Sequence, residues 1–199
     1  MNEEYSADHE VEDTGSDIPG AQDVGAQDAF IQIRHRESAQ PVRPHELIVA
    51  CPPMRSNVNV SRIARAAGCA GVQKLILCGA ARLVPEIARE AKTSLELELH
   101  RTLAPVLRKL RVDGFEIVGL EQTSGSVSIY EFAFRRRMVL VVGNERSGIA
   151  PEILKLCDRI VEIPVYGLPF AHNAATATAI AMYEYGRQMN VCSTDDASQ

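Results

Sequence analysis

Two strand-like segments that each run into a glycine-containing loop narrow the possible folds of this chain more than any other pattern in it. The first, Met138 to Val142, is an apolar run typical of strands buried on both faces, and it leads into Gly143-Asn144-Glu145-Arg146-Ser147-Gly148. The second, Arg159 to Ile163, leads into a loop at residues 164–171. Glycine lets a backbone adopt positive φ and come close to a ligand. Because ligands of open α/β sheets bind beyond the carboxyl ends of the strands, we expect a binding site where these loops meet.

Strand-like and helix-like patterns alternate along the rest of the domain. We predict further strands at residues 47–51, 72–78, 94–99 and 115–120, and helices at residues 57–68, 83–91, 103–111, 151–157 and 172–188. The alternation of Leu and Glu from Ser94 to Leu99 indicates a half-exposed edge strand. The first helix is expected to bury a stripe formed by Val60, Ile63, Ala64 and Ala67. The pattern predicts an α/β fold, a mostly parallel sheet with helices on both faces.

The net charge of −5 hides an uneven distribution of charge. Met1 to Ala29 contains nine acidic residues and no Lys or Arg, whereas Phe30 to Thr194 contains 21 basic and 15 acidic residues. A body with a positive net charge is compatible with contacts to nucleic-acid phosphates. The polar, acidic start predicts a disordered tail at residues 1–43, followed by one domain at residues 44–190 and a second disordered tail at residues 191–199.

Features that the sequence lacks disfavour several classes of protein. No apolar run reaches the roughly 18 to 20 residues that span a bilayer, and the N-terminus has no signal-peptide pattern. The five cysteines are scattered without a CxxC pair, which predicts reduced thiols in a cytoplasmic protein and no metal site. No Gly-x-Gly-x-x-Gly opens a helix, which argues against a nicotinamide-dependent dehydrogenase.

Three motifs, in this order, resemble those of the SpoU (TrmH-type) RNA ribose 2′-O-methyltransferases. The first is Asn59 to Arg65, which follows a predicted strand in the sequence, and the second is the loop Gly143 to Gly148. The third is Ile163-Pro164-Val165-Tyr166-Gly167, followed by Asn173 and Met182-Tyr183-Glu184. The likeness extends over about residues 46–188. It implies a C-terminal trefoil knot, S-adenosylmethionine as the methyl donor, a homodimer, and methyl transfer to a ribose 2′-hydroxyl of tRNA or rRNA.

The resemblance also implies roles for individual residues. The catalytic positions of the family are matched by Arg65, Asn59, Glu145 and Asn173. The cofactor-binding positions are matched by Gly143, Ile163, Gly167 and His172. The candidates for RNA contacts are Arg55 and Arg62. Because a guanidinium stays protonated, we interpret Arg65 as an electrostatic group that holds a phosphate and stabilises the developing alkoxide, not as a general base.

Some of these residues have two interpretations that the sequence leaves open. Glu145 either orients Arg65 or an RNA group across the dimer interface, or caps the turn that follows it. Asn173 is either a catalytic residue or a plain helix N-cap. The run Arg135-Arg136-Arg137 either follows RNA phosphates or forms a solvated loop before a buried strand.

One position departs from the family pattern. Members usually carry Ser-Leu-Asn or a similar triplet where this chain has Ala171-His172-Asn173. The side chain of Ala171 can neither donate nor accept a hydrogen bond. His172 either substitutes as the polar group or is structural. The missing hydroxyl motivates an alternative function, a non-catalytic RNA-binding paralogue that keeps the knotted fold.

Overall fold

The structure is a computed structural model that describes residues 45–195 of the 199-residue chain. The predicted tail at residues 1–43 therefore lies outside the described residues, as do residues 196–199. No helix among the described residues is long and apolar enough to cross a membrane.

Seven parallel strands form one sheet in the order β3-β2-β1-β6-β4-β7-β5. The strands are β1 Glu46–Cys51, β2 Lys74–Cys78, β3 Glu96–His100, β4 Glu116–Leu120, β5 Val127–Ser128, β6 Arg137–Val142 and β7 Arg159–Glu162. The predicted parallel sheet is confirmed, and so is the edge position of the Leu/Glu-alternating strand, β3. The sequence did not predict β5, because two residues are too few to show a period.

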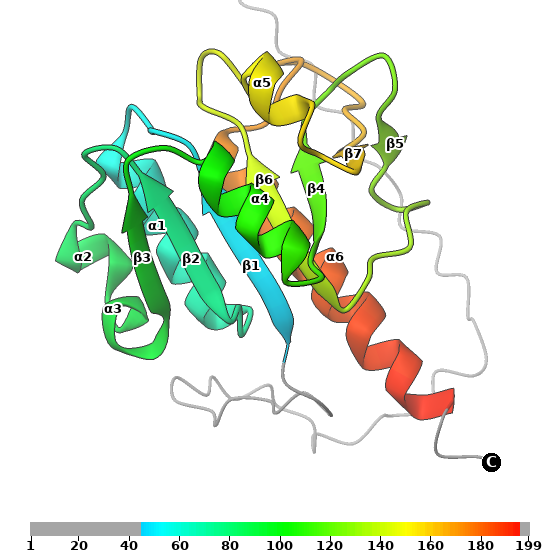
Figure 1. Cartoon of the computed structure of the whole chain (residues 1–199), viewed down its shortest axis with the longest axis horizontal. Coiled ribbons are helices and arrows are strands. Elements are labelled where there is room, and N and C mark those ends of the chain that lie inside the picture. The colour runs from blue at the N-terminus through cyan, green and yellow to red at the C-terminus, as the bar shows by residue number, and fades with distance from the viewer. Residues whose placement is uncertain (1–44, 196–199) are drawn as a thin grey trace, which may run out of the picture. The chain divides into compact units, whose positions relative to one another are not determined.

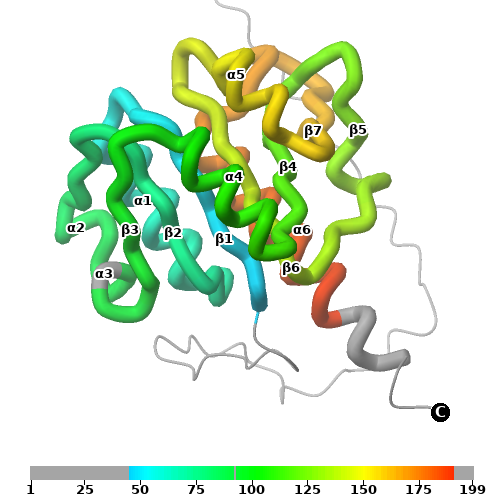
Figure 2. The backbone as a smooth tube through the Cα atoms, in the orientation of Figure 1, coloured from blue at the N-terminus to red at the C-terminus, as the bar shows by residue number. Residues whose placement is uncertain are grey.

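Helices cover both faces of this sheet, as predicted (Figures 1 and 2). They are α1 Asn57–Cys69, α2 Pro85–Ala88, α3 Ala91–Ser94, α4 Ala104–Val112, α5 Pro151–Leu154 and α6 Ala174–Asp195. Helices α1, α3 and α6 pack on one face, where the predicted stripe of α1 is fully buried. Helices α4 and α5 pack on the other face through residues such as Leu107 and Ile153. Alternate residues of each central strand point into the two clusters, which explains why these strands read as continuous apolar runs.

Three predicted helix boundaries were wrong. The single helix expected at residues 83–91 is split into α2 and α3, because Arg89 adopts a positive φ of 50° that interrupts helical geometry. Helix α5 ends at Leu154, earlier than the predicted Cys157. Helix α6 continues past Gln188 to Asp195, since residues 189–195 contain no glycine or proline to stop it. The domain boundary predicted at residue 190 therefore falls inside this helix.

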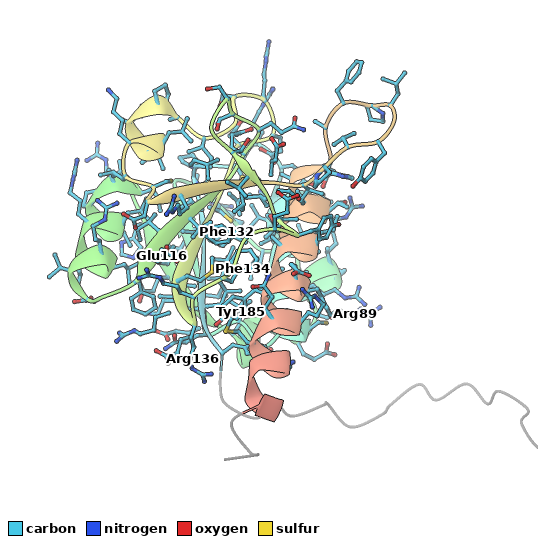
Figure 3. All side chains as sticks on the ribbon, turned by 90° about the vertical axis from the view of Figure 1, so that its right-hand side faces the viewer. Arg89, Glu116, Phe132, Phe134, Arg136 and Tyr185 are labelled. Atoms are coloured by element: carbon cyan, nitrogen blue, oxygen red, sulfur yellow. The ribbon has the colours of Figure 1, made fainter. Side chains whose placement is uncertain are left out.

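The C-terminal half of α6 anchors the segment that enters β6. The buried Tyr185 donates its hydroxyl to the carbonyl oxygen of Arg136 at 2.6 Å, and its ring lies edge-on to that of Phe134 (Figure 3). The Oε1 atom of Gln188 accepts from the backbone N–H of Phe134 at 2.9 Å, and its Nε2 donates to the carbonyl of Phe132 at 2.9 Å. These contacts fix α6, whose first turn reaches the carboxyl ends of the strands, against the central strand that carries the glycine loop.

Candidate functional site

A pocket of about 330 Å³ opens at the carboxyl ends of β4, β6 and β7 and at the start of α6. Three of the four predicted cofactor positions line it, namely Gly143, Ile163 and His172. The fourth, Gly167, is exposed and lies outside the lining. Glu145, Ala171 and Asn173 also line the pocket. The expectation of a site between the two loops therefore agrees with the position of this pocket.

The loop from Gly143 to Gly148 is a tight hairpin. The N–H of Asn144 donates to the carbonyl of Gly148 at 2.9 Å, and the N–H of Gly148 donates back at 3.0 Å. Gly148 has a φ of +65°, and a Cβ atom there would lie 2.3 Å from Oε2 of Glu121. A Cβ at Gly143 would meet both Glu121 and the backbone of Gly148 at 3.0 Å. The positive φ therefore favours glycine at position 148, and a side chain at either position would force the Glu121 carboxylate or the hairpin backbone to shift.

The sequence patterns did not point to Glu121, although it shapes one wall of the pocket. Its Oε2 atom accepts from the N–H of Ile149 at 2.8 Å, and Oε1 accepts from the N–H of Gln122 at 3.1 Å. The carboxylate thus connects the end of β4 to the residue that follows the hairpin. Its position directly after a predicted strand was the one signal available, and that signal does not reveal a contact with residues more than 20 positions away.

Three predicted catalytic residues meet in one hydrogen-bond network at the edge of the pocket. The carboxylate of Glu145 accepts from Nδ2 of Asn59 at 3.1 Å, and from the backbone N–H groups of Arg55 and Ser56 at 3.0 and 3.1 Å. Oδ1 of Asn59 in turn accepts from Nδ2 of Asn173 at 3.3 Å. The network joins the segment before α1, the glycine hairpin and the start of α6, which are the three motifs of the sequence.

The hydrogen bonds of Glu145 and Asn173 bear on the two interpretations that the sequence leaves open for each residue. Glu145 does not cap the turn that follows it; its carboxylate binds the backbone that leads into α1. Asn173 is an N-cap, because its Oδ1 accepts from the N–H of Ala175 at 2.9 Å, and its amide nitrogen simultaneously contacts Asn59. Its N-cap and network roles therefore coexist.

Glu145 is held in its charged form. Burial raises the pKa of Glu145, but hydrogen bonds from the backbone of Arg55 and of Glu145 itself, from the Asn59 side chain and from the backbone of Ser56 outweigh burial and lower the pKa below its ordinary value. Glu121 and Glu162 also line the pocket, against a single lining arginine, Arg146. Such a set of carboxylates favours a ligand that carries positive charge.

The predicted arginines lie outside this pocket. Arg65 is exposed on α1, six residues after Asn59, so the two side chains point about 120° apart around the helix. It is not among the residues that line the pocket of its own chain. Arg62 is also exposed on α1, and Arg55 is exposed at the rim, where its backbone contacts Glu145.

Residues 46–183, more than half of the chain, match the model of the SpoU rRNA Methylase family. The chain belongs to the SpoU family. The resemblance inferred from the three motifs is thereby confirmed, as is the mostly parallel α/β sheet. The trefoil knot that the resemblance implies stays a prediction.

Similar proteins give this SpoU family member a more detailed context. It is 31% identical over 150 residues to tRNA (guanosine(18)-2′-O)-methyltransferase of Aquifex aeolicus, which covers 73% of this chain and 71% of the relative. The crystal structure of the A. aeolicus TrmH/SpoU tRNA modifying enzyme superposes with a TM-score of 0.71 at 30% identity, covering 77% of this chain and 80% of that one. The SpoU methyltransferase AviRb from Streptomyces viridochromogenes, solved with the cofactor AdoMet, superposes with a TM-score of 0.63 at 28% identity. The superposition covers 74% of this chain and 62% of that one.

Proposed function

We propose that this SpoU family member transfers a methyl group from S-adenosylmethionine to a ribose 2′-hydroxyl of tRNA or rRNA. The observation that carries the proposal is the network of Asn59, Glu145 and Asn173, which joins the three motifs at the edge of the pocket. The names of the relatives support the reaction, because they describe 2′-O-methyltransferases that act on tRNA and modify RNA.

The residues of the pocket suit S-adenosylmethionine. A volume of about 330 Å³ is within the range of about 300 to 1,000 Å³ common for small-molecule sites. Backbone groups of the hairpin and of residues 163 and 172 can recognise an adenine edge, and the glycines permit a close approach. The carboxylates of Glu121, Glu145 and Glu162 favour a cation, which the sulfonium of this cofactor is. When bound, S-adenosylmethionine supplies a methyl group on a positively charged sulfur.

The protein's own contribution to the reaction is positioning and electrostatics. The network around Glu145 fixes the N-terminal end of α1 relative to the pocket, which limits where a nucleotide can enter. Arg65 binds the phosphate next to the reacting ribose and stabilises negative charge on the 2′-oxygen as the hydroxyl proton passes to solvent water. Because Arg65 does not line the pocket of its own chain, we assign this task to Arg65 of the partner subunit in a cytoplasmic homodimer.

Ala171 favours a second candidate function, RNA binding without turnover. This residue is exposed and lines the pocket at the position where the family usually carries a serine. A protein without that hydroxyl could keep the cofactor pocket and the RNA surface while losing the alignment of the 2′-hydroxyl. Under this alternative, Ala171→Ser would create an activity that the natural chain lacks.

A methyl-transfer assay separates the two candidates. The full chain is incubated with S-adenosylmethionine labelled on the methyl group and with total tRNA and total rRNA from cells that lack it. We expect label in a ribose 2′-O-methyl nucleotide, lost in Arg65→Ala and retained in Arg89→Ala, a matched exposed arginine outside the site. Tight RNA binding with no label in the natural chain, and label appearing in Ala171→Ser, would establish the non-catalytic alternative instead.

A further inference from the structure

A second cavity, a groove of about 660 Å³, lies at the amino ends of the strands. Its lining includes the first residues of four strands that are neighbours in the sheet, Glu46 of β1, Arg137 of β6, Glu116 of β4 and Arg159 of β7. Because all strands are parallel, the cofactor pocket lies at the opposite edge, and a six-residue strand such as β6 separates the two by about 20 Å. Figure 3 shows Arg136 of this groove at the lower end of the sheet.

The lining of the groove is positively charged. Five arginines and three carboxylates contribute to it, a net charge of +2: Arg111, Arg135, Arg136, Arg137, Arg159, Glu46, Glu116 and Asp158. Arg108 is exposed one helical turn before Arg111 on α4 and extends the basic surface beyond the groove. The sequence run Arg135-Arg136-Arg137, whose role the motifs left open, thus joins basic residues from α4 and β7 that are distant in the chain.

Ion pairs hold part of this cluster in place and leave another part available. Glu46 pairs with Arg136 and Arg137 at 3.2 and 3.3 Å, and Asp158 pairs with Arg111 at 2.8 Å. The guanidinium of Arg137 also lies 4.6 Å from the centre of the Phe115 ring. These contacts hold the arginine side chains in place, so the side chains lose less conformational entropy when a ligand binds.

Arg135 and Arg159 are the two arginines of the groove least restrained by ion pairs. The side chain of Arg135 is 78% exposed, and its one ion pair, between Nε and Oε2 of Glu116, is long at 3.7 Å. The guanidinium of Arg159 is exposed and has no ion pair within residues 45–195. Four neighbouring strands extend over about 15 Å, so the charges are spread along a line longer than one phosphate group. A chain of phosphates matches this layout better than a single small anion does.

We propose that this groove binds the phosphate backbone of the RNA substrate at a distance from the methylated ribose. The inference rests on the proposed function, which makes RNA the substrate. The pocket at the other edge, at about 330 Å³, has the size of a small-molecule site, so most of the RNA lies outside it. Guanidinium groups pair bidentately with phosphate oxygens, and each phosphate contact releases counterions. Arg135 and Arg159 therefore add sequence-independent affinity and fix how the RNA body lies across the domain.

The test compares two charge-reversed double variants of the full chain. Arg135→Glu/Arg159→Glu changes the groove, and Arg89→Glu/Arg101→Glu makes the same change of charge at two exposed arginines outside both cavities. Total tRNA and total rRNA serve as probes, and affinity is measured between 50 and 300 mM salt. We expect the groove variant alone to lose RNA affinity by roughly tenfold or more and the slope of log K against log salt to fall by about 1.4 to 1.8. Affinity for S-adenosylmethionine should be the same in all three proteins.

The possible outcomes separate this inference from the proposed function. If the natural chain methylates RNA and the groove variant binds it as tightly as the control variant does, the groove inference is wrong and the proposed function stands. If the natural chain binds no RNA, both are wrong. Arg135→Gln/Arg159→Gln provides a second measurement should charge reversal lower the thermal midpoint, and it should show the same direction of change with a smaller loss of affinity.

Discussion

Arg65 is the residue on which the proposed reaction depends most, and its position makes a specific prediction. Removing a preorganised charge from a developing oxyanion costs about 100- to 1,000-fold in rate. We expect Arg65→Ala to lower the rate of methyl transfer in a single turnover by that factor, and Arg65→Lys by nearly as much, because an ammonium cannot reproduce the guanidinium fork. Since Arg65 does not line the pocket, calorimetry should find an unchanged affinity for S-adenosylmethionine. An equal loss of cofactor affinity would contradict the assignment.

The lowered pKa of Glu145 predicts that the free energy of unfolding depends on pH. Its pKa is lowered in the folded chain, so its contribution to stability is fully present above the ordinary pKa of a glutamate, about 4.3, and is lost as the pH falls through the lowered value. Glu145→Gln leaves the N–H groups of Arg55 and Ser56 and the amide of Asn59 with a weaker acceptor, and we expect a loss of about 1 to 2 kcal/mol in the free energy of unfolding at pH 7.

Denaturant titrations at pH 7 and pH 3 measure this effect. The difference between the natural chain and Glu145→Gln should shrink toward the lower pH, as the pH falls through the lowered pKa of Glu145 and its carboxylate loses charge. Glu131→Gln is the matched control, because Glu131 is exposed and its carboxylate makes no hydrogen bond or ion pair among the described residues. A difference that stays constant with pH would show that the charge of Glu145 does not support the network.

At the scale of elements, the glycine hairpin and β4 act as one unit through Glu121. In Gly148→Ala the added Cβ must occupy space taken by Oε2 of Glu121, at a backbone φ of +65° that disfavours alanine by about 1 to 2 kcal/mol. We expect this variant to bind S-adenosylmethionine at least tenfold more weakly, because the added Cβ strains the hairpin and displaces the Glu121 carboxylate from the N–H of Ile149, and both the hairpin and Glu121 line the pocket. Glu121→Ala removes the obstacle, so the double variant should recover part of the affinity that Gly148→Ala loses.

A double-mutant cycle on cofactor affinity tests this coupling. Losses that simply add would mean that Glu121 and Gly148 affect the pocket independently. Gly125→Ala is the control for a loop glycine, because a Cβ there would have no atom within 4 Å and its φ is not positive.

The elements that the sequence predicted are those with local signals. The central strands were predicted because burial on both faces requires continuous apolar runs, and α1 because its apolar residues repeat at helical spacing. Glu121 was not found, because its role comes from a contact with Ile149, 28 residues away. The split at Arg89 was missed for the opposite reason, since one strained φ overrides a pattern that is otherwise helical.

For the candidate site too, local patterns predicted some features and long-range contacts determined the others. The motifs predicted which polar residues belong to it, but not that Asn59 connects Glu145 to Asn173, because the amide contacts bridge 86 and 114 residues. The position of Arg65 could not be predicted from spacing alone. Helical geometry sets the direction of the Arg65 side chain relative to Asn59, whereas the group that this side chain faces depends on how two subunits assemble.

At the scale of the whole molecule, one surface next to the pocket suits assembly. The loop between β7 and α6 exposes three large apolar side chains, Tyr166 at 92%, Leu168 at 78% and Phe170 at 79%, and α6 exposes Tyr183 at 58%. Large apolar side chains exposed to this extent are typical of protein–protein interfaces. A dimer formed through this surface would bring the partner's α1 toward the pocket only if α1 and α6 lie on the same face of the sheet. They do, because both helices pack in the same hydrophobic cluster on that face.

A complementation experiment tests whether Arg65 acts on the pocket of the other subunit. Arg65→Ala removes the guanidinium and keeps the pocket, whereas Ala171→Trp places a large side chain at the exposed rim of the pocket and keeps the guanidinium. Each variant alone should form inactive homodimers. After random exchange of subunits in an equal mixture, half of the dimers combine the two, and each contains one intact site, so about a quarter of the natural activity should return. If Arg65 serves the pocket of its own chain, no dimer contains an intact site and the mixture stays inactive.

Sedimentation of the mixture provides the control, because a monomer at micromolar concentration would leave Arg65 without a pocket to act on.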